Sequence, residues 1–207
     1  MGAIRAVFFD FGGVLVRMVD DRPRLRLAQQ LGISLDRLDN LVYYSESAQK
    51  ASRGEIPVRL HWEAVGRALG IPMGNMPHFL QQYWSADDVN WELLEYIKRL
   101  HPGYKVGLIS NAWDDLRQTM HRRWNFDVLF DEMIISAEVG MVKPDPRIFH
   151  LAVARFDVAP AQAVFIDDTL DNVEAARREG LGAIQFITTR QTIDELENIL
   201  NAGKQGG

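Results

Sequence analysis

Polar side chains that could carry chemistry stand at four points of the sequence, each after a short apolar run, directly or across a loop. They are Asp10, Ser110-Asn111, Lys143 and Asp167-Asp168. Apolar runs of this length, bounded by glycine or polar residues, are typical of strands buried on both faces of a parallel sheet. Ligands bind such sheets beyond the carboxyl ends of the strands. The four points are therefore expected to meet at one edge of the sheet.

The residue types at this predicted edge suit the transfer of a phosphoryl group. Carboxylates brought close together repel one another unless a cation lies among them, and oxygen ligands suit Mg²⁺. Gly12 and Gly13 follow Asp10, so the backbone can approach a ligand closely. Ser110-Asn111 are predicted to lie at a helix N-terminus, which favours an anion, and Lys143 adds a charge suited to phosphate. The set indicates transfer through an aspartyl-phosphate.

Each piece taken alone has a structural explanation. Asp10 could form a turn after its strand, Ser110-Asn111 could cap a helix, and Lys143 could be an exposed loop lysine. Asp167-Asp168 are harder to explain in this way, because adjacent carboxylates at a buried strand end are costly without partners. The order and placement of all four favour the functional interpretation.

Helices and strands alternate from residue 89 onward, which predicts a parallel, doubly wound α/β sheet. Residues 17–88 contain no convincing strand and several helical patterns. The sequence thus predicts a core of residues 1–16 and 89–207, with a small all-helical domain, residues 17–88, inserted after the first strand. The capping box of Thr192 and Glu195 predicts the start of the last helix. One face of the helix after Ser110-Asn111 is expected to carry Trp113, Leu116, Met120 and Trp124.

The composition limits the classes of function. The 207 residues carry 23 Lys and Arg against 28 Asp and Glu, and the net charge of −5 argues against a nucleic-acid-binding surface. The chain has no cysteine, so a metal would be held by oxygen or imidazole ligands. No apolar run approaches the roughly 20 residues of a membrane span, and no signal-peptide pattern opens the chain. A cytoplasmic protein is expected, and the sequence leaves its oligomeric state open.

Four segments, in order, resemble the motifs of the haloacid dehalogenase (HAD) superfamily. They are Asp10-Phe11-Gly12-Gly13-Val14-Leu15, Leu108-Ile109-Ser110-Asn111, Gly140-Met141-Val142-Lys143-Pro144 and Phe165-Ile166-Asp167-Asp168. The resemblance extends over essentially the whole chain. It implies a Rossmann-like core, with residues 17–88 in the place of a helical cap. Hinge strands are expected at Val16–Asp20 and Ser85–Asn90.

The resemblance also implies roles for individual residues. Asp10 would be the catalytic nucleophile, with Ser110 and Lys143 holding the phosphoryl group. Contacts to the substrate would come from Gly12, Gly13, Ser110, Asn111 and Lys143. The implied substrate is a small phosphorylated metabolite.

The implied cofactor is Mg²⁺. Its ligands would be Asp10, the backbone carbonyl of Gly12, and Asp168. Asp167 would mainly lie next to these ligands without binding the metal directly.

Gly12 departs from the family pattern. Phosphatases of this superfamily usually carry a second aspartate at this position, an acid/base of a kind that contributes ~10²–10⁴-fold. Three outcomes follow: a leaving group that needs little protonation, such as an anomeric sugar oxygen or an acyl group; a substitute acid from the cap; or lost turnover. Suggested substitute acids are His61, His78 and Glu55. A branch resembling sugar-1-phosphate phosphatases also has glycine here and a segment similar to Arg53-Gly54-Glu55-Ile56, which favours the first outcome.

Two other functions stay open at this point. A 2-haloacid dehalogenase would use Asp10 on carbon without a metal, but those enzymes usually have tyrosine in place of Gly12 and lack paired acids like Asp167-Asp168. A pseudo-phosphatase would bind a phosphorylated ligand or partner without turnover, yet the retained nucleophile, lysine and acids favour hydrolysis. The cap residues expected to face the core are Tyr43, Tyr44, Gln49, Arg53 and Trp84.

Overall fold

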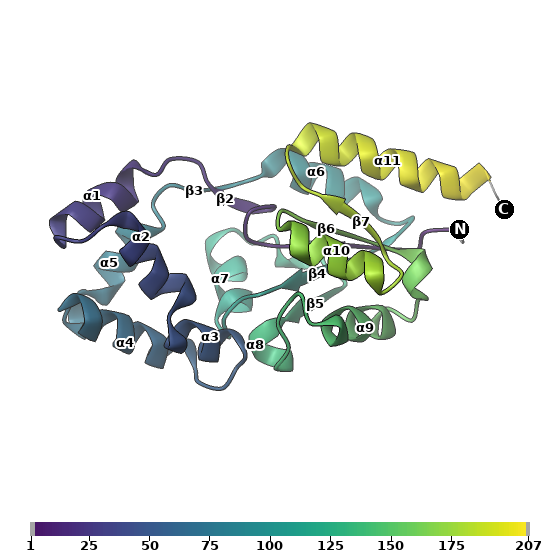
Figure 1. Ribbon diagram of the computed structural model, residues 1–207. Helices are drawn as coiled ribbons and strands as arrows, with labels where there is room; N and C mark the ends of the chain where they lie inside the picture. The colour runs from purple at the N-terminus through teal and green to yellow at the C-terminus, as the bar shows by residue number, and fades with distance from the viewer. Residues whose placement is uncertain (1–2, 206–207) are drawn as a thin grey trace.

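The structure is a computed structural model that describes residues 3–205. Its core is a parallel sheet in the order β5-β4-β1-β6-β7 (Figure 1). These strands are β1 (Ala6–Phe9), β4 (Lys105–Ser110), β5 (Glu132–Ile135), β6 (Ala163–Asp167) and β7 (Gly182–Gln185). The predicted α/β fold, with helices inserted after the first strand, is confirmed.

β1 occupies the centre of the sheet, because its uninterrupted apolar side chains suit a strand covered on both faces. Val7 and Phe9 pack into one hydrophobic cluster, and Ala6 and Phe8 pack into the other. The first cluster is covered by α6 (Trp91–Leu100), α7 (Leu116–Arg123) and α11 (Thr189–Gln205), and the second by α9 (Pro146–Arg155) and α10 (Leu170–Arg178). The core is therefore a three-layer sandwich with a short helix, α8 (Ser136–Val139), after β5.

The insertion begins and ends in a two-stranded antiparallel ribbon. β2 (Val16–Met18) leads out of the core and β3 (Asp87–Val89) leads back, within the two segments expected as hinges. Between them lie α1 (Arg22–Gln30), α2 (Leu35–Asp39), α3 (Glu46–Ser52), α4 (Val58–Leu69) and α5 (Met76–Tyr83). Figure 1 shows these helices grouped at one end of the molecule, with α7 between them and the sheet.

The insertion has a hydrophobic cluster of its own. Leu38, Val42, Trp62 and Tyr83 belong to it, and Trp113 of the core packs against it. Local signals set the helix starts: the Ser34 hydroxyl accepts the amide of Arg37, and the Ser45 hydroxyl accepts that of Ala48. Across residues 3–205, none of the helices has the length and apolar character needed to cross a membrane.

Two predicted helix starts are wrong. The helix after β4 begins at Leu116, so Ser110-Asn111 do not lie at a helix N-terminus. Trp113 accordingly stands in the loop before α7 and not on its buried face. The last helix begins at Thr189, one turn before the predicted capping box at Thr192.

Candidate active site

Asp10 and Asp167 lie side by side where β1 and β6 end. The two strands pair in register up to Phe9 and Ile166, and the Asp10 amide donates to the Ile166 carbonyl at 2.8 Å. Both carboxyl groups are buried, Asp167 completely. Parallel pairing of two apolar strands thus brings two carboxylates to one edge of the sheet.

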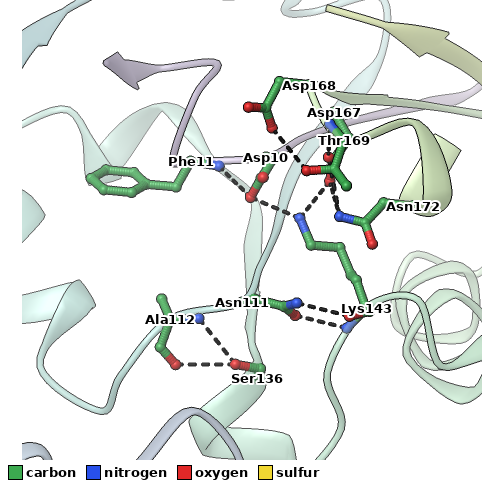
Figure 2. A network of polar contacts seen from close by, with 10 residues as sticks. All are labelled: Asp10, Phe11, Asn111, Ala112, Ser136, Lys143, Asp167, Asp168, Thr169 and Asn172. Atoms are coloured by element: carbon green, nitrogen blue, oxygen red, sulfur yellow. Dashed lines mark hydrogen bonds and ion pairs between the residues drawn. The ribbon is translucent and has the colours of Figure 1, made fainter. Parts of the chain in front are cut away.

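Lys143 places its ammonium between these carboxylates (Figure 2). Nζ is 2.8 Å from Asp10 Oδ1 and 2.6 Å from Asp167 Oδ2. Burial lowers the pKa of Lys143, but the two carboxylates raise it by more, so the net shift is upward and the ammonium stays charged. Burial also raises the pKa of Asp10 to about 7; Lys143 opposes this rise and Asp167 adds to it. One ammonium therefore does not compensate the carboxylates around it.

Asp167 is fully engaged by hydrogen-bond donors. Oδ1 accepts the Thr169 amide at 2.8 Å, and the Asn172 side-chain amide donates to both carboxylate oxygens at 3.1 Å. With Lys143 on Oδ2, both oxygens are occupied. Asn172 is buried and was not among the sequence candidates. Its only sequence signal was an amide five residues after Asp167, in the helix that follows the paired acids.

Asp168 lies against Gly13. A Cβ atom at Gly13 would stand 2.2 Å from Asp168 Oδ2, and the residue has a φ of +79°, so no L-side chain fits there. The Asp168 residue is exposed, and its carboxylate accepts a hydrogen bond from the Thr169 hydroxyl at 3.4 Å. Partial loss of solvent around the carboxyl group raises the pKa of Asp168, and the charge of Asp167 raises it further. Gly13 thus makes room for a carboxylate that has few hydrogen-bond partners of its own.

Asp10, Asp167 and Asp168 could together hold a cation, because each offers an oxygen within 4.8 Å of the others. Two carboxylates contact one ammonium and a third lies close to them, so when all three are ionised the cluster has two more negative than positive charges. A divalent cation with oxygen ligands, such as Mg²⁺, neutralises that charge. Because Asp167 is already engaged, Asp10 and Asp168 are the better placed to act as direct ligands.

Ser110 and Asn111 reach the same edge from β4. The Ser110 side chain is buried, and within the described residues its hydroxyl makes no hydrogen bond to the other candidates. Asn111 is expected from the sequence to contact substrate, but its amide holds the backbone of Lys143. Its Nδ2 donates to the Lys143 carbonyl at 2.9 Å, and its Oδ1 accepts the Lys143 amide at 2.7 Å.

Gly12 faces open space. A Cβ atom there would meet no heavy atom within 4 Å, and the backbone is not left-handed. A side chain would therefore fit, and neither strain nor crowding requires the glycine. The chain simply offers no acid at this point.

Among the cap residues expected to face the core, the Tyr43 side chain does so, and within the described residues Trp84 meets the core only through its backbone carbonyl. Tyr43 stacks on Trp113, with ring centroids 6.4 Å apart, and the Trp84 carbonyl accepts a hydrogen bond from Arg123 of α7 at 3.2 Å. The polar side chains of Gln49 and Arg53 bind partners inside the insertion, the Tyr44 carbonyl and Glu55. Tyr44 itself is 68% exposed.

His61 is unsuited to serve as the missing acid. Its side chain is completely buried in the insertion, where Nδ1 lies 2.9 Å from the Ser47 hydroxyl. Burial lowers its pKa to about 4, so the ring is neutral near pH 7. His78 is exposed on α5, and Glu55 pairs with Arg53 at 2.6 Å.

Comparisons with known proteins agree with this geometry. A family model of haloacid dehalogenase-like hydrolases matches residues 4–180. A sesquiterpene phosphatase of Aspergillus oryzae is 26% identical over 204 residues, covering 95% of this chain and 96% of that protein. D-ribitol-5-phosphate phosphatase of Bacteroides thetaiotaomicron is 26% identical over 213 residues, covering 96% of this chain and 100% of that protein.

A solved structure has the same fold. It is a HAD family enzyme from Bacteroides thetaiotaomicron in complex with magnesium and inorganic phosphate, with a TM-score of 0.74 and 21% identity. The alignment covers 88% of this chain and 93% of that one. The family match spans most of the chain and includes all four points at the sheet edge. The chain therefore belongs to the haloacid dehalogenase-like hydrolases.

Proposed function

We propose that the protein is a magnesium-dependent phosphomonoesterase that acts through an aspartyl-phosphate on Asp10. The observation that carries this proposal is the cluster of three carboxylates, Asp10, Asp167 and Asp168, which outnumber the one buried ammonium of Lys143 beside them. The two relatives that are phosphatases, and the structural neighbour that holds magnesium and phosphate, support it. The proposed substrate is a small phosphorylated metabolite.

In the proposed reaction, Asp10 attacks phosphorus through Oδ2. Oδ1 accepts hydrogen bonds from Lys143 and from the Phe11 amide at 2.7 Å, whereas Oδ2 has no hydrogen-bond partner within residues 3–205. The Asp10–phosphorus bond forms as the ester bond breaks, and the leaving oxygen departs with the bonding electron pair. Water then attacks the same phosphorus and breaks its bond to Asp10, so the Asp10 carboxylate is restored; one hydrogen of the water leaves on the phosphate, and the other balances the proton taken up by the leaving oxygen. One water is consumed in each cycle.

Lys143 would stabilise the negative charge of the phosphoryl oxygens, which its ammonium reaches from between the carboxylates. The Ser110 hydroxyl would donate a hydrogen bond to the same phosphoryl group. Asp10, the Gly12 carbonyl and Asp168 would hold Mg²⁺, which when bound offsets the charge of the phosphoryl group. Asp167 and Asn172 would hold Lys143 in place and not contact the substrate.

The glycine at position 12 favours leaving groups that need little protonation. An anomeric sugar oxygen or an acyl oxygen departs more readily as an anion than a simple alkoxide does. A sugar 1-phosphate is therefore the proposed substrate class. An acyl phosphate would satisfy the same requirement.

The first experiment is a phosphate-release assay on the pure protein, with and without Mg²⁺, beside the Asp10→Asn variant. The panel includes sugar 1-phosphates, sugar 6-phosphates and acetyl phosphate. 2-Chloropropionate is tested beside them for the release of chloride. Mg²⁺-dependent release of phosphate that Asp10→Asn lowers by on the order of 10⁴-fold or more is expected for loss of a nucleophile. Metal-independent release of chloride would instead identify a dehalogenase. Magnesium binding without turnover of any compound would favour the alternative of a pseudo-phosphatase that binds a phosphorylated ligand or partner.

Restoring an acid tests the interpretation of Gly12. Because a side chain meets no obstacle there, Gly12→Asp is expected to raise kcat/KM for alkyl phosphates by about 10-fold or more, and to change acetyl phosphate little. Gly12→Asn has the same size and no acidic proton, so it serves as the matched control. Equal rates for the two variants on alkyl phosphates would show that protonation of the leaving group is not what limits turnover.

A further inference from the structure

Residues 111–115, which connect β4 to α7 and are called here the bridging loop, hold the backbone of Lys143. The two-way hydrogen bonds between the Asn111 amide and the Lys143 peptide groups fix both sides of that residue, at 2.7 and 2.9 Å. The Lys143 side chain then extends to Asp10 and Asp167 (Figure 2). A shift of Asn111 would therefore move the ammonium at the reaction centre.

The middle of the bridging loop is tied to the end of β5. The fully buried Ser136 hydroxyl accepts the Ala112 amide at 3.0 Å and donates to the Ala112 carbonyl at 3.1 Å. The Ala137 amide donates to the same carbonyl at 3.3 Å. The insertion reaches this point too, because Gly54 lies so close to the Ala137 carbonyl that a Cβ would stand 2.1 Å from it.

The far end of the bridging loop is held by the insertion. The Trp113 ring lies 5.0 Å from the Trp62 ring and 5.2 Å from His61, measured between centroids, besides its stacking on Tyr43. Its indole N–H is buried and has no hydrogen-bond partner in the described part of the chain, so packing against the insertion sets the position of the ring. Asp114 Oδ1 also accepts the Val58 amide at 3.1 Å, which caps the start of α4.

We propose that the bridging loop makes the position of Lys143 depend on docking of the insertion, with Asn111, Trp113 and Asp114 as positioning residues. This inference rests on the proposed function, in which Lys143 acts on the phosphoryl group. The loop is short: five residues span at most about 16–18 Å when fully extended. In the proposed coupling, loss of the Trp113 and Asp114 contacts at one end loosens the Ser136 bonds to Ala112 and, through them, the Asn111 bonds at the other end.

Hydrogen exchange of the Lys143 amide tests this directly, because that N–H donates to Asn111. In Asp114→Ala and in Trp113→Leu we expect its protection to fall about 5-fold or more. Asp114→Asn keeps an acceptor for Val58 and should retain protection. Asp36→Ala removes an exposed carboxylate from α2 of the insertion, away from the bridging loop, and should leave exchange unchanged. Asp114 is exposed, so its variants keep the test valid if Trp113→Leu fails to fold.

Binding of inorganic phosphate in the presence of Mg²⁺, measured by calorimetry, provides the functional readout. If the loop positions Lys143, phosphate affinity should fall in Asp114→Ala by a factor similar to the loss of protection, although Asp114 does not touch the site. If the loop only docks the insertion, the KM of larger substrates will rise while phosphate affinity and Lys143 exchange stay unchanged, and the inference is overturned. If the wild type hydrolyses no phosphoester yet exchange responds as expected, the proposed function fails and the coupling stands.

Discussion

Lys143 in the sheet core and Arg24 in the helical insertion are both nearly removed from solvent, at 4% and 5% exposed. The Arg24 guanidinium lies 3.0 Å from Asp87 Oδ1, donates to the Tyr83 carbonyl at 3.2 Å, and stands 4.2 Å from the centroid of the Tyr83 ring. The Trp84 ring lies 5.2 Å away. One carboxylate balances the charge, and aromatic faces cover the rest of the planar group.

Lys143 is held in a different way. Two buried carboxylates contact its ammonium, and a third, Asp168, lies close to them with few hydrogen bonds. The Arg24 cluster is complete within the chain, whereas the Lys143 cluster becomes neutral only with a further cation. A balanced buried charge indicates a role in folding, and an unbalanced one indicates a site that binds something.

The largest effect is expected for Lys143→Met, which breaks the unbalanced cluster. Asp10 and Asp167 would be left buried side by side, which should lower the free energy of unfolding by about 3–5 kcal/mol. The variant also loses the charge that faces the phosphoryl group, so phosphate release should fall about 10²–10³-fold. Urea denaturation and the phosphate assay measure the two effects. Wild-type turnover by the folded variant would remove Lys143 from the proposed mechanism.

Arg24→Met tests the balanced cluster. Asp87 would be left buried and unpaired, so unfolding free energy should again fall by about 3–5 kcal/mol. Turnover per folded molecule should stay the same, and adding Asp87→Leu should recover most of the stability. Arg22→Met, which breaks an exposed pair with Asp20, should leave the urea midpoint unchanged. If Arg22→Met shifted the urea midpoint as much as Arg24→Met, burial of the ion pair would not be the cause of the lost stability.

A smaller effect is expected from pH, through His61 of the insertion. Burial holds its folded pKa at about 4, below the unfolded value near 6.5, so the unfolded chain binds this proton first. Stability from this group is present above pH 6.5 and is lost as the pH falls towards 4, by about 3 kcal/mol. Asp10 and Asp87, whose pKa values are raised by burial, act in the opposite direction.

The contribution of His61 is therefore isolated by measuring the urea midpoint between pH 7.5 and 4.5 in the wild type and in a matched pair of variants. His61→Gln should flatten the acid side of the profile, and His78→Gln, an exposed histidine on α5, should leave its slope as in the wild type. Parallel profiles for all three proteins would contradict the role given to His61.

The convergence of Asp10, Lys143 and Asp167 could be predicted from the sequence because it depends on few facts. Each apolar run fixes a strand, and parallel strands share one edge for their carboxyl ends. No side-chain detail enters this reasoning. Two helix starts in the insertion are also marked by local chemistry, since Ser34 precedes α2 and Pro57 precedes α4.

The bridging loop could not be predicted in this way. Its residues follow a helical pattern, yet Ser136 and Lys143, 24 and 32 positions further along the chain, hold Ala112 and Asn111 outside any helix. Contacts so distant in sequence leave no local signal. The amphipathic pattern placed Trp113 with Leu116 and Met120, whereas its ring packs against the insertion.

The predicted start of the last helix was wrong for another reason, because the sequence contains two possible capping boxes. In the structure, the Thr188 hydroxyl accepts the Gln191 amide at 3.2 Å, and the Gln191 side chain accepts the Thr188 amide at 3.4 Å. This pair starts the helix one turn before Thr192. Local chemistry identified the type of signal but did not choose between two copies of it.

The ribbon of β2 and β3 makes the insertion an exchangeable module. Val16 and Val89 are Cα partners, as are Met18 and Asp87, so the chain departs from the core and returns to it at neighbouring points. Paired Cα atoms in an antiparallel ribbon are about 4.5–5.5 Å apart, a gap that a two-residue hairpin turn closes. Residues 19–86 could be excised or replaced by another segment while both strand ends keep their places. Grafting at this junction would assign the same carboxylate edge to different substrates without rebuilding the sheet beneath it, provided that the new segment also packs on Trp113 and Asp114 of the bridging loop.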